Sequence, residues 1–222
     1  MGIGLSIGLV TASILFFIGF LLFGVRTYKK KYTVSYDLRN TFPYEINYKT
    51  RFLDNIFVNV FLVLSMTSSI GYFAFFDIKN LSGVVIVILI CGLLLSIINF
   101  FMFFADLKYI RFHLILLVLQ SISAFGLAGS IGVFGLISFQ KDNGYIVGLI
   151  VAILAIALGL FIFALMMNPK LNFRLEMVKT ITPEGKETLV RPTYFVLAFT
   201  EWLFIFSLFI SQLLLLILYI PF

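Results

Sequence analysis

Glu201 is the residue whose chemistry stands out first, because it is the only acid inside a long apolar stretch of the sequence. An ionisable group at membrane depth is costly and by default marks a functional site. Two depths are open to it. A helix that enters the membrane at Tyr194 carries Glu201 roughly 10 Å inward, at about 1.5 Å per residue. Trp202, however, favours the lipid–water interface. A hydrated Glu201 among the headgroups, with Tyr194–Thr200 along the interface, is the simpler interpretation.

Few neutral polar side chains accompany Glu201 in the apolar stretches, and Asn99 and Gln120 are the two that could reach its half of the membrane. Such groups most often form hydrogen bonds between helices, where each contributes about 0.6–2 kcal/mol. Together with Glu201 they could instead form a shallow polar patch that opens toward the cytoplasm. The candidate solute-binding residues are therefore Glu201, Gln120 and Asn99.

Residues that could form a catalytic centre do not come together in the sequence. Ser130 would need a base, but His113, the one histidine, lies 17 positions earlier on the same predicted helix. That spacing is about 25 Å along a helix axis, which exceeds the hydrogen-bond reach of a nucleophile and its base. His113 is most simply an interfacial residue, and one cysteine, Cys91, with one histidine predicts no metal site. The sequence argues against an enzyme and predicts no cofactor.

Six long apolar segments position these residues. The chain has 222 residues, of which 62% are hydrophobic and 12% are charged, whereas a soluble domain has roughly 25% charged residues. Each segment contains about 20 or more mostly apolar residues, enough to cross a hydrocarbon core of ~30 Å as a helix. We predict an all-α integral membrane protein in which residues 1–222 form one six-helix domain. The predicted spans are Gly2–Val25, Ile56–Phe76, Leu81–Phe104, Leu114–Phe139, Tyr145–Met167 and Tyr194–Tyr219.

The first predicted span could alternatively be a signal peptide. It has no basic residues before its apolar run, and that run is longer than the apolar region of a typical signal peptide. Arg26 and Lys29–Lys31 follow it directly and resemble a stop-transfer flank. These features favour a retained membrane span.

The connections between the spans alternate in charge. Residues 26–55, 105–112 and 168–193 carry seven, two and five Lys or Arg residues, respectively, whereas 77–80 and 140–144 carry one lysine each. The positive-inside rule places the basic connections in the cytoplasm, so both termini lie outside and the outer hairpins are short. We predict a multi-pass protein of the plasma membrane, whose basic residues face anionic lipid headgroups rather than nucleic acid.

A run of glycines marks the fourth predicted span. Gly126, Gly129, Gly132 and Gly135 recur there at intervals of three residues. Residues three and four apart share a helix face, and small residues on such a face let another helix approach closely. We predict that these four glycines form one helix-packing groove.

The two longer basic connections contain patterns of secondary structure. In Glu176–Arg191, Pro183-Glu184-Gly185 separates two runs that alternate apolar and polar residues, which predicts a β-hairpin. The connection 26–55 contains aromatic and β-branched residues that favour extended segments. The two connections could form one small cytoplasmic cap, or both could be solvated linkers.

These features favour a permease-type subunit that binds or moves a small or lipid-like solute. The alternative is a non-catalytic scaffold or assembly subunit, which agrees better with the sparse polar interior. An intramembrane lipid-modifying enzyme is the third interpretation. The predicted partners are the lipid bilayer and other membrane or cytoplasmic subunits, which would bind through residues 26–55 and 168–193.

Overall fold

The computed structural model describes most of the chain. The described residues are 2–32, 35–46, 55–76, 82–141, 146–168, 178–181, 187–190 and 194–219. Predictions that fall on residues between these ranges, such as the turn at Pro183-Glu184-Gly185, lie outside the described part.

Six helices in the described part are long and apolar enough to cross a membrane, as the sequence predicts. Helices α1 and α4 extend beyond their predicted spans, and α1 continues through Lys29–Lys31 because polar flanks can remain helical outside the hydrocarbon. Two short 3₁₀ helices, η1 (Pro43–Ile46) and η4 (Leu107–Tyr109), lie in the connections. The long helices are α1 (Ile3–Tyr32), α2 (Ile56–Ala74), α3 (Gly83–Met102), α4 (Ile110–Lys141), α5 (Ile146–Met166) and α6 (Val196–Tyr219).

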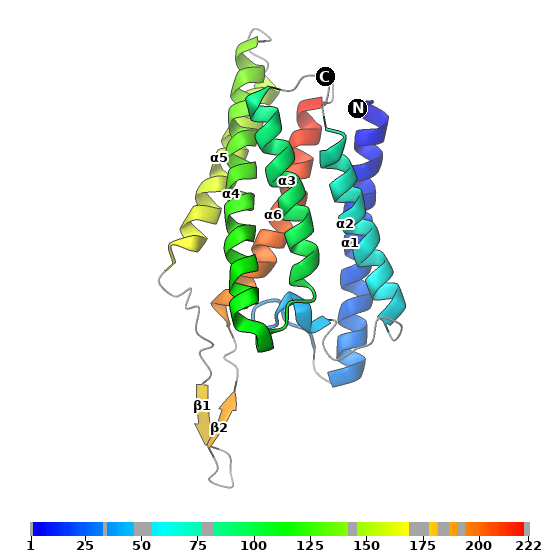
Figure 1. Cartoon of the computed structure of the whole chain (residues 1–222), viewed down its shortest axis with the longest axis vertical. Coiled ribbons are helices and arrows are strands. Elements are labelled where there is room, and N and C mark those ends of the chain that lie inside the picture. The colour runs from blue at the N-terminus through cyan, green and yellow to red at the C-terminus, as the bar shows by residue number, and fades with distance from the viewer. Residues whose placement is uncertain are drawn as a thin grey trace.

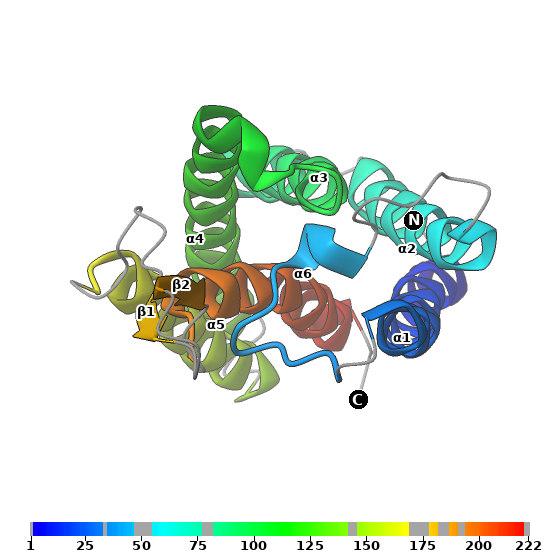
Figure 2. The same ribbon diagram turned by 90° about the horizontal axis from the view of Figure 1, so that it is seen from below.

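Helix α6 lies at the centre of the bundle. It packs against α1, α3, α4 and α5, while α1 to α5 follow one another around it in chain order. Figure 2 shows this arrangement from one end of the bundle. We call this the basic end, because Lys29–Lys31 and Lys108 lie there, and α1 begins and α6 ends at the opposite end (Figure 1).

The central position of α6 agrees with its composition. It buries five polar side chains, namely Thr200, Glu201, Ser207, Ser211 and Gln212. Polar groups in a membrane protein face the bundle interior because lipid cannot satisfy their hydrogen bonds. One such contact ties α6 to α1, where the Ser13 hydroxyl lies 2.8 Å from Gln212 Oε1.

The four glycines of α4 do not form one groove, which corrects the prediction from the sequence. A Cβ atom at Gly135 would lie 2.7 Å from the carbonyl oxygen of Gly148 on α5, and one at Gly132 would meet Ile156 of α5. Gly126 instead faces Cys91 of α3. Gly129 is exposed, and a Cβ atom added there would have no neighbour within 4 Å.

The physical reason for this spread is the helix period. Three residues turn an α-helix by about 300°, so each step of three moves the glycine by about 60° around the axis. Gly126 and Gly135 therefore lie on opposite faces of α4, one toward α3 and the other toward α5. Only Gly132 and Gly135 allow close approach of α4 to α5.

Replacing Gly135 with alanine is expected to destabilise the protein by about 1–3 kcal/mol, because the new methyl group would overlap the backbone of α5. Gly129→Ala is the matched control on the same helix. Its methyl group has open space, and alanine favours a helix by about 1 kcal/mol over glycine. Thermal unfolding in detergent measures both, and equal midpoints for the two variants would contradict this packing of α4 on α5.

A predicted cap over the helices is not supported. Two four-residue strands, β1 (Val178–Ile181) and β2 (Glu187–Val190), pair antiparallel with Val178 opposite Val190. Figure 1 shows them beyond the basic end, apart from η1. The described part of the connection 26–55 packs instead against the ends of the helices, with η1 in contact with α1 and α6.

Candidate functional site

Glu201 pairs with His113 inside the bundle. His113 Nε2 lies 2.7 Å from Glu201 Oε1, and both side chains are completely buried. His113 stands near the start of α4 and Glu201 near the start of α6, so the pair lies close to the basic end. Glu201 is therefore enclosed between helices rather than hydrated at an interface, and α6 is continuous through Thr200.

The hydrogen bonds of His113 fix where its protons lie. Nδ1 is 2.8 Å from the carbonyl oxygen of Ala105. A carbonyl oxygen can only accept, so Nδ1 must donate and carries a hydrogen. Nε2 then either donates to an ionised Glu201 or accepts from a protonated Glu201. In both forms one proton lies between Nε2 and Oε1, and the pair as a whole is neutral.

Residues 35–46, which we call the strap, cross the middle of the bundle at its basic end (Figure 2). Within it, Pro43 occupies the first position of η1, where a missing N–H costs no hydrogen bond. The Glu45 carboxylate accepts a hydrogen bond from the backbone N–H of Phe42 at 2.7 Å, as in one half of a capping box. These local bonds give the strap a defined conformation.

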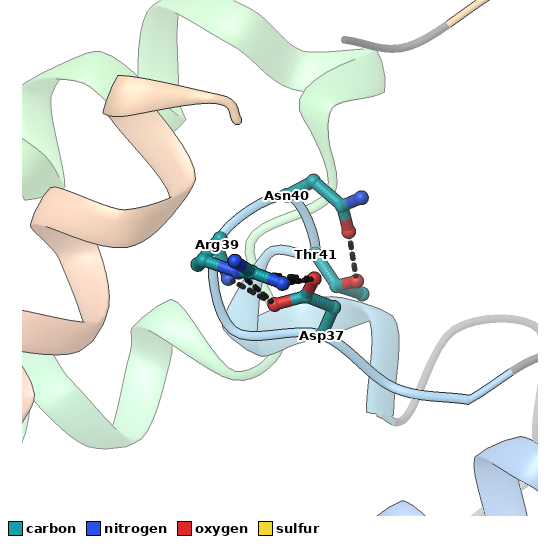
Figure 3. A network of polar contacts seen from close by, with 4 residues as sticks. All are labelled: Asp37, Arg39, Asn40 and Thr41. Atoms are coloured by element: carbon teal, nitrogen blue, oxygen red, sulfur yellow. Dashed lines mark hydrogen bonds and ion pairs between the residues drawn. The ribbon is translucent and has the colours of Figure 1, made fainter. Parts of the chain in front are cut away.

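A turn at Asp37–Thr41 begins the strap (Figure 3). The Arg39 guanidinium contacts the Asp37 carboxylate at 3.0 Å, and the backbone N–H of Arg39 donates to the same carboxylate. The Thr41 hydroxyl donates to Asn40 Oδ1 at 2.9 Å. The hydrogen bonds from Arg39 lower the pKa of Asp37. This contact between Arg39 and Asp37 is therefore kept at neutral pH and is lost only as the pH falls through that lowered pKa.

Two hydrogen bonds hold the strap to α6 and to Phe195, the residue before α6, and a third lies within the strap. Trp202 Nε1 donates to the carbonyl oxygen of Thr41 at 2.9 Å, and the backbone N–H of Phe195 donates to the carbonyl oxygen of Arg39 at 2.7 Å. The Tyr36 hydroxyl donates to the carbonyl oxygen of Phe42 at 2.9 Å. Burial raises the pKa of Tyr36 well above its ordinary value, so this hydroxyl keeps its proton. Trp202 thus ties α6 to the strap from the position next to Glu201.

Aromatic rings of the strap cover the pair. Phe42 and Tyr44 place their ring centroids 5.8 and 6.1 Å from that of His113, both nearly edge-on. Phe42 also contacts Phe195 at 5.2 Å. Neither the Phe42 nor the His113 side chain is accessible to solvent. Water is therefore excluded from the pair while the strap is in this position.

Asn99 and Gln120 form a second buried layer. Gln120 Nε2 donates to Asn99 Oδ1 at 2.7 Å, which joins α3 to α4, and both side chains are fully buried. Gln120 follows His113 by seven residues on α4, or about 10 Å along the helix axis. The structure thus brings together two of the three residues that the sequence singles out. Glu201 lies in a separate layer, nearer the basic end.

Each layer contains buried polar atoms without a hydrogen-bond partner among the described residues. Beside the His113–Glu201 pair these are Glu201 Oε2 and Thr200 Oγ1, and in the second layer they are Asn99 Nδ2 and Gln120 Oε1. Buried polar atoms are almost always hydrogen-bonded, so such groups call for an explanation. These atoms include both hydrogen-bond acceptors and donors.

Sequence reasoning missed His113 and the strap. Two signals pointed to the pair: Glu201 is the only acid within an apolar segment, and His113 is the only histidine of the chain. Both stand near the same end of their helices. Which faces of α4 and α6 meet, however, depends on packing that a single sequence does not reveal.

No group of three or more His, Cys, Asp or Glu side chains in the described ranges could hold a metal ion. Comparison of the chain with known protein families, with curated proteins and with solved structures finds no match. Any assignment of function therefore depends on the arrangement of the site itself.

Proposed function

We propose that this chain is a permease-type membrane protein and that the His113–Glu201 pair forms part of its solute-binding site. The supporting observation is the complete burial of the pair beneath a strap held by hydrogen bonds. Ionisable groups at membrane depth are costly and are usually kept where a solute, an ion or a proton is handled. In this proposal the described conformation is a closed state of the transport cycle.

The strap is the inner gate in this proposal. Two hydrogen bonds join the strap backbone to α6 and to Phe195, the residue before α6. They are Trp202 to Thr41 and Phe195 to Arg39. Each contributes a net of about 0.5–1.5 kcal/mol, and burial of Phe42 contributes about 3–5 kcal/mol more. The open strap is then a minor population that forms transiently. Opening would remove Phe42 and expose Glu201 Oε2 to water. A small solute with hydrogen-bond donors could then bind that oxygen.

The basic end faces the cytoplasm in this proposal, and the protein resides in the plasma membrane. Fourteen of the sixteen Lys and Arg residues fall in connections on that side, which is the arrangement that the positive-inside rule requires. The strap then opens to the cytoplasm, and α1 begins and α6 ends on the outside.

Cysteine labelling tests transport without knowledge of the solute. Thr200 is fully buried next to Glu201, and its hydroxyl has no partner among the described residues. In a variant that lacks Cys91, Thr200→Cys in sealed vesicles should react with a small, impermeant thiol reagent added from the cytoplasmic side. It should also react from the outer side, because a permease exposes its site to each side in turn.

Ser207→Cys on α6 is the matched control. Ser207 is also buried, but its hydroxyl donates to the carbonyl oxygen of Phe204 in its own helix. This position is expected to stay unlabelled from both sides. If Thr200→Cys were as unreactive as Ser207→Cys, the pair would be permanently sealed and the permease proposal would be wrong.

A scaffold or assembly subunit is the second candidate. The observation that favours it is that several buried polar contacts join neighbouring helices. Asn99–Gln120 joins α3 to α4, Ser65 donates to the Ser13 carbonyl oxygen between α2 and α1, and His113–Glu201 joins α4 to α6. Such contacts stabilise a rigid bundle. Sealing of Thr200 from both sides would favour this function.

A further inference from the structure

We propose that the His113–Glu201 pair is a proton-binding site whose proton is released when the strap opens. This inference rests on the proposed function and specifies the ligand of that site. It follows from three features. The hydrogen bond from His113 Nδ1 to the Ala105 carbonyl oxygen has a fixed direction, acidic groups lie around the pair, and the strap covers it.

The closed pair holds one proton between its two residues. Because the Ala105 carbonyl oxygen fixes a hydrogen on Nδ1, a single further proton occupies the 2.7 Å contact from Nε2 to Oε1. Loss of that proton would leave a neutral imidazole whose lone pair faces an ionised carboxylate. Both side chains are fully buried, and an unpaired charge buried away from water is strongly unfavourable.

The titratable groups near the pair favour retention of the proton. Glu45 of η1 acts electrostatically on Glu201, Asp106 acts on His113, and Tyr36 of the strap interacts electrostatically with Glu201. Helices α3 and α5 contain no Asp, Glu, Lys, Arg or His. Among the described residues, the neighbours that act on the pair are therefore acids and a tyrosine. If the pair lost its proton, the negative charge left on Glu201 would be repelled by the acidic neighbours.

Opening of the strap favours release of the proton instead of its retention. Phe42, Tyr44 and Glu45 belong to one segment, so they leave the pair together, and water reaches Nε2 and Oε1. The proton then passes to water and leaves a hydrated carboxylate and an imidazole that still carries its Nδ1 hydrogen. Above the ordinary histidine pKa of about 6.5, the open site binds about one proton fewer than the closed site. Closure and proton binding are therefore coupled.

The rate of Thr200→Cys labelling from the cytoplasmic side tests the coupling. If each opening releases one proton, the equilibrium constant for opening increases by up to about tenfold for each unit by which the pH is raised. The measurement spans the range from about pH 6.5 to two units above it, starting at the ordinary histidine pKa. The same thiol in a Glu201→Gln background is the reference, because it has the same intrinsic reactivity with the reagent.

Glu201→Gln keeps the hydrogen bond to Nε2 but gives a closed site with no shared proton. In this variant the labelling rate of Thr200→Cys, divided by the fraction of the thiol that is ionised, should not change with pH over this range. With the wild-type pair, the same ratio should increase by up to about tenfold per pH unit. Thermal unfolding checks that the variant is folded. If it is not, the double variant His113→Leu/Glu201→Leu, which has no group that could hold the shared proton, offers the same comparison. Equal slopes with and without the pair would overturn the coupling alone. Absence of labelling at every pH would overturn the proposed function and the coupling with it.

Discussion

Replacement of His113 with leucine is expected to lower the stability of the protein by about 3–5 kcal/mol, because it leaves Glu201 buried without its partner. For a chain of this length, each kcal/mol shifts the thermal midpoint by roughly 2–4 °C. The midpoint in detergent should therefore fall by roughly 6–20 °C. Glu201→Gln retains a hydrogen bond to His113 and should cost far less.

The double variant His113→Leu/Glu201→Leu is the control for this prediction. Replacement of a whole buried ion pair with apolar residues is often neutral or even stabilising. The double variant should therefore recover most of the stability that the single His113→Leu variant loses. A single variant within about 0.5 kcal/mol of wild type, as for a surface substitution, would place His113 in water and contradict the buried pair.

Replacement of Phe42 with alanine is expected to open the strap. Phe42 is fully buried against His113 and Phe195, and truncation of a buried phenylalanine costs about 3–5 kcal/mol. The loss falls mainly on closure of the strap, because that segment carries the side chain. Since each 1.4 kcal/mol is about a tenfold change in an equilibrium, labelling of Thr200→Cys should accelerate by at least about tenfold.

Phe104→Ala is the matched control for the strap. Phe104 lies just after α3, but its side chain is 46% exposed, so its removal leaves no buried cavity. Labelling of Thr200→Cys should be unchanged in this background. Equal acceleration by both substitutions would mean that general loosening of the bundle, rather than removal of the strap, exposes the site.

The membrane spans could be predicted from the sequence because length and hydropathy determine them directly. Ile56 and Tyr219 are the ends of their helices in both the prediction and the structure. The end of α1 differs, at Tyr32 instead of Val25, because hydropathy detects the edge of the hydrocarbon and not the end of the hydrogen-bonded helix. The arrangement around α6 depends on contacts between faces and was not predicted.

The candidate site was predictable only in part. The sequence suggests one patch of Asn99, Gln120 and Glu201, whereas the structure joins only Gln120 and Asn99 by a hydrogen bond and places Glu201 in a separate layer. The partner of Glu201 was missed because His113 stands 88 residues away in sequence, and each residue alone resembles an interfacial group. The strap was missed for a related reason: buried rings such as Phe42 and Tyr44, in a connection, resemble ordinary loop residues until the bundle end that receives them is known.

The central claim is that the one histidine of the chain is buried and paired with Glu201, and nitrogen NMR of the protein labelled at histidine tests it most directly. Because there is a single histidine, the imidazole signals need no assignment to a residue. The structure predicts two hydrogen-bonded ring nitrogens protected from exchange with water, and a shift of the Nε2 signal, but little of Nδ1, in Glu201→Gln. A free imidazole that exchanges rapidly with water and is unaffected by Glu201→Gln would contradict the buried pair.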